Sequence, residues 1–297
     1  MEQVYIYIEE NQILTSEWQE RLATDLKRDG IMLSVLSGEE WEKCCDSFTT
    51  SLENTEQKYI FVTDCEEKAV RTAAKGCPVL GCLHEKNRHR PFGGVRFLTE
   101  PEGVEAGYLD KVYRRYAGIS WQILETPRCI VRETTPEDVD AFYKIYADAS
   151  ITRYMENLFA DKADELRYVE QYRKNMYEFY GFGIWTVLLK ETGEVIGRAG
   201  FDLREGYKEP ELGFVIGKPW QRRGLAKEVC SAILLYGATD LGFETVQALA
   251  APENTVSRTL LEALGFSSAG RCPDNFIRYL FTLHPEEPQN LPHPYGP

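Results

Sequence analysis

Residues 221–226 of this 297-residue chain, Gln-Arg-Arg-Gly-Leu-Ala, carry the pattern with the clearest chemistry. An apolar run at 211–216 precedes them, and apolar residues at helical spacing follow. A strand that turns through a glycine-containing loop into a helix presents unpaired backbone N–H groups at the positive end of the helix dipole. The pattern predicts a phosphate or pyrophosphate site, in which Gly224 permits close approach and Arg222 and Arg223 add positive charge.

Other segments flank this loop in a regular order. Residues 129–132 are typical of a strand, and Thr135 follows as an N-cap candidate with proline at the next position. Residues 245–250 are typical of another strand, and Asn254 precedes a helical run that ends Leu-Gly-Phe at 264–266. A glycine at this place is a common C-cap, so we expect the helix to end there.

Taken together, these segments resemble the GNAT N-acetyltransferases over about residues 127–283, in particular the branch that acetylates ribosomal-protein N termini. The resemblance implies a mixed α/β GNAT fold, acetyl-coenzyme A as co-substrate, and acetyl transfer to a primary amine of a small molecule or a peptide N terminus. A GNAT fold that binds acyl-coenzyme A without turning it over is the alternative. The cofactor contacts implied are Phe214, Val215, Ile216, Gln221, Arg222, Arg223, Gly224, Leu225, Ala226 and Asn254.

The resemblance also implies how the strand at 214–216 serves the reaction. Its backbone would pair with the pantetheine arm as another strand would. One N–H of this strand, expected at Val215, would face the thioester oxygen, where a preorganised donor contributes about 3 kcal/mol.

A base is needed as well, because an amine with a pKa near 10 is mostly protonated at pH 7. Glu211 is the candidate, since strand alternation places it on the same face as Val215. An exposed strand-end carboxylate is the plain alternative, and Glu209 is the second choice. Ser257 is the candidate acid for the leaving thiolate, because the family's tyrosine four residues later is Leu261 here. A helix hydroxyl bonded to a backbone carbonyl is the alternative for Ser257.

The charge of the acceptor stays open at this stage. Glu156 would pair with a cationic amine, and Tyr154 and Phe159 would offer aromatic faces. Arg198 would favour an acceptor that carries a carboxylate instead. Surface ion pairing is the plain explanation for each of these charges.

Composition limits the partners and the compartment. A net charge of −13 argues against nucleic-acid binding and is compatible with a cationic acceptor. Runs of 18 apolar residues and a signal segment are both missing, which favours a cytoplasmic protein without a membrane span. The eight cysteines include no C-x-x-C pair and show no ligand spacing with the four histidines, so we expect reduced thiols and no metal. A homodimer is compatible with the sequence.

The length predicts two domains, and we place them at residues 1–125 and 126–297, with a proline-rich irregular tail from about residue 284. Short apolar runs alternate with helical ones in the first half, which favours a parallel sheet in a Rossmann-like or haloacid-dehalogenase-like α/β domain. A phosphatase of that fold would carry an aspartate after the first strand, where this chain has Glu9 and Glu10; Asp64 after the third strand is an isolated carboxylate. We therefore expect a non-catalytic first domain that binds a ligand or docks on the second half, and hydrolysis of a generic phosphate ester would contradict this.

Overall fold

The computed structural model describes residues 1–9, 16–49, 59–272 and 274–283. The chain divides into two compact units, Met1–Trp121 and Gln122–Pro297. This division lies four residues before the boundary that we placed after residue 125, because residues 122–125 form a strand of the second unit's sheet. The expected proline-rich tail lies outside the described residues.

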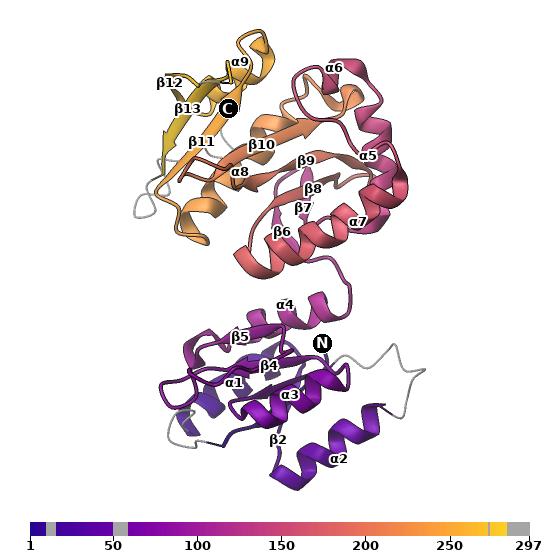
Figure 1. The fold of residues 1–297 in the computed structure, drawn as a ribbon, viewed down its shortest axis with the longest axis vertical. Helices are drawn as coiled ribbons and strands as arrows, with labels where there is room; N and C mark the ends of the chain where they lie inside the picture. The colour runs from indigo at the N-terminus through magenta and orange to yellow at the C-terminus, as the bar shows by residue number, and fades with distance from the viewer. Residues whose placement is uncertain (10–15, 50–58, 273, 284–297) are drawn as a thin grey trace. The chain divides into compact units, whose positions relative to one another are not determined.

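A five-stranded parallel sheet in the order β2-β1-β3-β4-β5 forms the centre of the first unit (Figure 1). Alternation along its strands sends Val4 and Ile6 to one face, which α1 and α4 cover, and Phe61 and Val79 to the other, which packs on α2 and α3. The predicted parallel α/β fold is thus confirmed. Its elements are β1 (Gln3–Tyr7), α1 (Ser16–Arg28), β2 (Met32–Val35), α2 (Gly38–Thr49), β3 (Tyr59–Thr63), α3 (Glu66–Ala74), β4 (Val79–Cys82), β5 (Phe97–Thr99), the 3-10 turn η1 (Pro101–Gly103) and α4 (Ala106–Tyr116).

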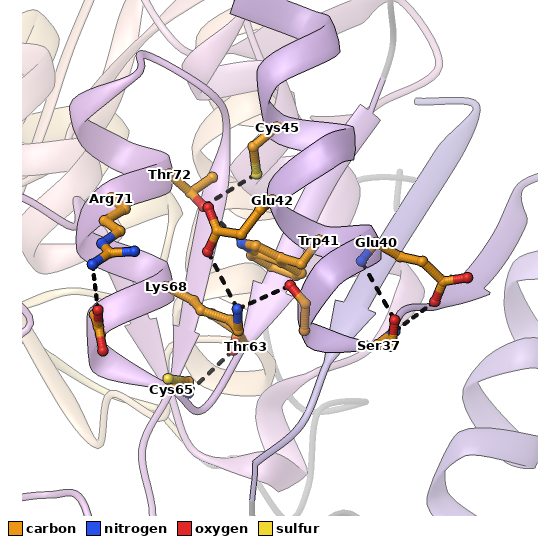
Figure 2. Close-up of polar contacts among 12 residues, drawn as sticks. Ser37, Glu40, Trp41, Glu42, Cys45, Thr63, Cys65, Lys68, Arg71 and Thr72 are labelled. Carbon is orange, nitrogen blue, oxygen red and sulfur yellow. Dashed lines mark hydrogen bonds and ion pairs between the residues drawn. The ribbon is translucent and has the colours of Figure 1, made fainter.

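Side-chain contacts hold α2 against α3 (Figure 2). The buried Trp41 donates its indole N–H to Thr72 Oγ1 at 3.1 Å, and Cys45 Sγ lies 3.4 Å from the same oxygen. Lys68 Nζ reaches the carbonyl of Gly38 and the carboxylate of Glu42, both at 3.3 Å. These contacts satisfy the polar groups that the two helices would otherwise bury unpaired.

Asp64 lies where ligands often bind in such sheets, at the carboxyl end of a strand beside the point where the strand order reverses. Its Oδ1 accepts the backbone N–H of Glu9 at 2.7 Å, and its Oδ2 lies 3.5 Å from His84 Nε2. Asn87 holds the Asp64 carbonyl at 2.8 Å. Asp64 therefore ties together the ends of neighbouring strands, whereas Glu10 lies outside the described residues. Among the described residues, no group of three or more Cys, His, Asp or Glu side chains is placed to hold a metal ion.

The second unit is built on an eight-stranded mixed sheet in the order β12-β13-β11-β10-β9-β8-β7-β6 (Figure 1). Helix α8 packs on one face with Leu212 and Ile216, and α5 packs on the other with Val215. The elements are β6 (Gln122–Glu125), β7 (Cys129–Arg132), η2 (Pro136–Asp138), α5 (Val139–Tyr146), α6 (Ala149–Thr152), α7 (Lys162–Tyr172), the π-helical η3 (Arg173–Tyr180), β8 (Ile184–Leu189), β9 (Val195–Asp202), β10 (Glu211–Ile216), η4 (Lys218–Trp220), α8 (Leu225–Thr239), β11 (Thr245–Ala250), α9 (Thr255–Ala263), β12 (Ser267–Arg271) and β13 (Ile277–Thr282).

All eight cysteines are free thiols. Across the described ranges, no helix combines the length and the apolar character needed to cross a bilayer.

Candidate functional site

The most unusual feature of the second sheet is a gap between two neighbouring strands. β10 and β11 run parallel but pair at one position only, Glu211 with Gln247, where Gln247 N–H donates to the Pro210 carbonyl at 2.9 Å. β10 nevertheless continues to Ile216, fully paired with β9 on its other side. Among the described residues, 213–216 of β10 therefore have no strand partner on the β11 side. Apart from the Ile216 carbonyl, which Gln221 binds, their backbone edge is open to an extended ligand.

Strand alternation decides which backbone groups of β10 face the gap. Gly217 N–H donates to Ile196 of the β9 strand, so the residues of the same parity, including Val215, direct their N–H groups to β9. Phe214 and Ile216 have the other parity and face the gap. The expectation for Val215 is therefore corrected: its N–H belongs to the β9 ladder, and the thioester donor would be Phe214 or Ile216. Val215 instead buries its side chain against α5.

The loop at 221–224 continues from this open edge. Gln221 donates its side-chain amide to the Ile216 carbonyl at 2.8 Å, which fixes the turn out of the strand. Arg222 has a φ of 60° and Gly224 a φ of 75°. Both angles lie in the left-handed region, which is strained for residues other than glycine. Such strain in a non-glycine residue is typical of functional loops, and successive N–H groups in this geometry form a concave anion site.

Helix α8 begins directly after Gly224 with unsatisfied donors. Its first intrahelical bond is Glu228 N–H to Gly224 carbonyl, and within the described structure the N–H groups of residues 225–227 have no partner. Arg222, Arg223 and Lys227 are exposed. The side chain of Leu225 lies in the core, so that residue can offer a ligand only its backbone. The arrangement fits a pyrophosphate.

A residue almost one hundred positions earlier braces this loop. Arg128 donates to the Arg223 carbonyl at 2.8 Å and forms an ion pair with the buried carboxylate of Glu228, with Nη2 to Oε2 at 2.6 Å. Glu228 also accepts the Arg128 backbone N–H at 2.9 Å. Burial by itself would raise the pKa of Glu228, but the hydrogen bonds from Thr126 and Arg128 outweigh it and lower the pKa below its usual value.

We expect Glu228→Gln to destabilise the second unit by about 1–3 kcal/mol at pH 7, because the Arg128 guanidinium loses its charged partner. The folded-state pKa of Glu228 is lowered, so its stabilisation is present above the carboxyl pKa of the unfolded chain and is lost as the pH falls through the folded value. The difference between variant and wild type should therefore shrink in acid. Calorimetric unfolding at pH 7 and pH 4 tests this, with the exposed Glu191→Gln as control; an equal difference at both pH values would contradict it.

Helix α9 begins across the gap, and Asn254 is its N-cap. Asn254 Oδ1 accepts the Ser257 backbone N–H at 3.2 Å. The half-buried Ser257 hydroxyl makes no hydrogen bond to any residue that the structure describes. The carbonyl-bonded hydroxyl considered from the sequence is thus not found there, and Ser257 Oγ is free to reach a ligand.

Both carboxylates considered as bases are paired with arginines. Glu211 binds Arg204 through two contacts, one of them Nη2 to Oε1 at 3.2 Å. Glu209 binds Arg278 Nη2 at 2.5 Å. A guanidinium holds a carboxylate ionised but opposes its taking a proton. Glu209 would have to leave Arg278, and Glu211 would have to leave Arg204, to act as a free base.

Asp202 is a carboxylate beside Glu211 that the sequence analysis did not single out. It lies directly opposite Glu211 in the β9–β10 register. Burial raises the pKa of the Asp202 carboxyl, and the negative charge of Glu211 raises it further. Its Oδ1 accepts the Leu203 N–H at 2.8 Å, and it has no ion-pair partner among the described residues. A cavity of about 370 Å³ opens here, lined by Asp202, Leu203, Arg204, Glu205, Tyr207, Glu211 and Asp274.

The three predicted acceptor residues lie in different settings. Tyr154 donates its hydroxyl to the Glu253 carbonyl at 3.4 Å, which connects the segment after α6 with the loop before α9. Glu156 is exposed. Arg198 is 9% exposed, and its guanidinium lies 4.7 Å from the centre of the Phe142 ring. Arg198 alone among the three is a buried charge.

Comparison with known proteins identifies the family of the second unit. Residues 128–267 match the family model of the acetyltransferase (GNAT) domain. The uncharacterized N-acetyltransferase YoaA of Bacillus subtilis is 30% identical over 151 residues, which cover 50% of this chain and 84% of YoaA. The [ribosomal protein uS5]-alanine N-acetyltransferase of Escherichia coli is 31% identical over 111 residues, 37% of this chain and 55% of that enzyme. The RimJ structure of Mycobacterium smegmatis with CoA-disulfide aligns with a TM-score of 0.47 at 16% identity, covering 55% of this chain and 85% of RimJ.

The chain belongs to the GNAT acetyltransferases. It is an acyltransferase, and members of this family use acetyl-coenzyme A.

Proposed function

We propose that this protein binds acetyl-coenzyme A along β10 and transfers its acetyl group directly to a primary amine. The observation that carries the proposal is the open β10 edge at residues 213–216, which leads straight into the strained, cationic loop at 221–224. An extended pantetheine arm would pair with the edge, and the pyrophosphate would bind the loop and the first turn of α8. Both halves of coenzyme A thus find complementary groups on one continuous segment.

The reaction needs a stabilised oxyanion and a place for two protons. The amine nitrogen forms a bond to the acetyl carbon while the carbon–sulfur bond breaks. Phe214 or Ile216 N–H would stabilise the negative oxygen. Asp202, directly or through water, would take the proton from the amine nitrogen, and Glu211 across the register is the alternative base. Ser257 would relay a proton from solvent water to the thiolate, which leaves as the free thiol.

Ser257→Ala should lower kcat by about tenfold or less, because a coenzyme A thiolate leaves readily even without a positioned acid. The KM for acetyl-coenzyme A should change little. Steady-state kinetics with free-thiol detection tests this, and Thr259→Ala on the exposed face of the same helix is the control. A rate equal to wild type would remove Ser257 from the mechanism.

Calorimetric titration with acetyl-coenzyme A, followed by turnover with an amine panel, tests the proposed function. Because one relative is named for a ribosomal-protein alanine, the panel includes peptides with an N-terminal alanine beside small amines. Micromolar binding and thiol release that depends on an amine would support acetyl transfer. Binding without turnover of any amine would favour the acyl-coenzyme A sensor considered from the sequence.

The first unit would serve this activity without chemistry of its own. Asp64, the isolated carboxylate after the third strand, accepts the Glu9 backbone N–H and lies beside His84. We place a ligand-binding or docking role in residues 1–121, and a phosphate-ester hydrolase activity of the full chain would overturn this.

A further inference from the structure

Arg198 is a buried cation, and Asp202 is a carboxylate whose charge interacts with it. The residue is only 9% exposed, and its Nε atom is fully buried and has no hydrogen-bond partner among the described residues. The Arg198 guanidinium forms no ion pair with any carboxylate that the structure describes. A buried charge without a counter-ion is costly, and proteins usually pair it or use it.

Aromatic rings surround Arg198, and the Asp202 carboxylate is close enough to interact with its charge. Phe142 of α5 lies under the guanidinium, and the phenols of Tyr146, Tyr172 and Tyr177 surround it. These rings stabilise the cation partly, through their π faces and hydroxyl dipoles. The two terminal nitrogens make no hydrogen bond to a described residue and, unlike Nε, are not fully buried, so they keep donors that a ligand can use.

Arg198 also lies on the acceptor side of the proposed site. It is directly opposite Val215 in the β9–β10 register, on the strand next to the one whose far edge would hold the cofactor. Farther along the same face, Gly200 and Gly213 are opposite each other, and then Asp202 and Glu211. The two glycines contribute no side chains to this stretch. Ile184 of β8 borders it, with Cδ1 3.1 Å from where a Gly213 Cβ would lie, and so does the Tyr172 phenol, which accepts the Ile184 N–H at 2.7 Å and interacts with both Arg198 and Asp202.

The two ends of this face have opposite charge. The cavity at Asp202 and Glu211 also contains Glu205 and Asp274, which favours an ammonium group. The other end offers the unpaired guanidinium of Arg198. A molecule with an amine at one end and a carboxylate at the other would match both ends, whereas a diamine would place a cation next to Arg198.

We propose that the acceptor is a carboxylate-bearing amine, an amino acid or a short amino-acid analogue, and that Arg198 binds its carboxylate. This inference rests on the proposed acetyl transfer and specifies its acceptor. It selects against polyamines and against peptide N termini, which have no carboxylate close to the reacting amine.

The test compares matched acceptors: glycine, β-alanine, 4-aminobutyrate and glutamate, each beside its carboxamide, with putrescine as a diamine. Turnover is measured for wild type, for Arg198→Met, which keeps the volume without the charge, and for the exposed Arg167→Met as control. We expect Arg198→Met to raise the KM of carboxylate acceptors by about tenfold to a hundredfold, the loss of a charge-assisted contact. The KM of the carboxamides and the affinity for acetyl-coenzyme A should stay unchanged. Wild type that prefers carboxamides or putrescine would overturn the inference.

Two further readouts separate this inference from the proposed function. First, Arg198→Met should raise the Tm of the protein without acceptor, because it removes an unpaired buried charge; a lowered Tm would assign Arg198 a structural role instead. Second, binding of the same panel is measured by calorimetry with coenzyme A present. One outcome is that carboxylate acceptors bind to wild type but not to Arg198→Met, and that no acceptor is acetylated. That outcome would refute acetyl transfer and support the anion site. Equal binding of carboxylates and carboxamides to wild type would refute the anion site whatever the turnover.

Discussion

Gly224→Glu should weaken acetyl-coenzyme A binding by about a hundredfold or more, roughly 2.7 kcal/mol. Three effects act together. Gly224 has a φ of 75°, which any L side chain resists. A Cβ there would lie 3.5 Å from Arg128 Nη2, so a glutamate side chain would draw that guanidinium away from Glu228. The new carboxylate would also stand at the proposed pyrophosphate position, beside unpaired N–H groups that favour an anion.

A matched control is Gly242→Glu, at the other end of the same helix. Gly242 also has a positive φ, 67°, with nothing within 4 Å of its Cβ position. It lies about 22 Å away along a helix of fifteen residues, so it repeats the charge and the strain without touching the loop. Calorimetric titration of both folded variants decides the question: an affinity of Gly224→Glu equal to that of Gly242→Glu would move the pyrophosphate site elsewhere.

Asp202→Asn should lower kcat by about a hundredfold at neutral pH, the usual contribution of a positioned base. The loss should shrink at high pH, where the amine is neutral without help. In wild type, the acid limb of the pH profile should lie above the ordinary range of aspartate, because burial and then Glu211 raise the pKa of Asp202. Initial rates from pH 6 to pH 10 measure both effects.

Glu211→Gln is the decisive comparison, since it removes the carboxylate opposite Asp202. Without that negative charge the pKa of Asp202 should fall, and the acid limb should move to lower pH. We expect a smaller fall in rate than for Asp202→Asn, because Glu211 is held by Arg204. A larger loss in Glu211→Gln, or a pH-independent defect in Asp202→Asn, would return the role of base to Glu211.

Local patterns were enough to predict most of the fold. Strand β3 (Tyr59–Thr63) is one of the short apolar runs that favoured a parallel sheet, and it is buried on both faces. The strand, loop and helix at 211–239 were predicted in order, since the glycine, the helical spacing and the flanking charges act within one segment. β6 was missed, because its four residues are partly exposed and become a strand only by pairing with β7.

The site was harder to predict, because its key contacts join residues far apart in sequence. Nothing near Arg128 in the chain indicates that it braces a loop 95 residues later. Whether Phe214 or Val215 faces the cofactor depends on which neighbour each N–H bonds, and the apolar run looks the same in either case. Strand alternation could have placed Arg198 and Asp202 on one face of the sheet. That Arg198 lies opposite Val215 and Asp202 opposite Glu211 follows only from the register of the folded strands.

The single pairing between β10 and β11 has a consequence for the life of the protein in the cell. Where a ladder inside a sheet is incomplete, water and other chains can reach the backbone. The ligand-free protein therefore has unpaired strand backbone in the middle of its sheet, as at a sheet edge. A bound coenzyme A molecule would act as the missing strand and close it. The ligand-free form should therefore be the one that proteases and aggregation remove first, so that the amount of enzyme follows the supply of its co-substrate.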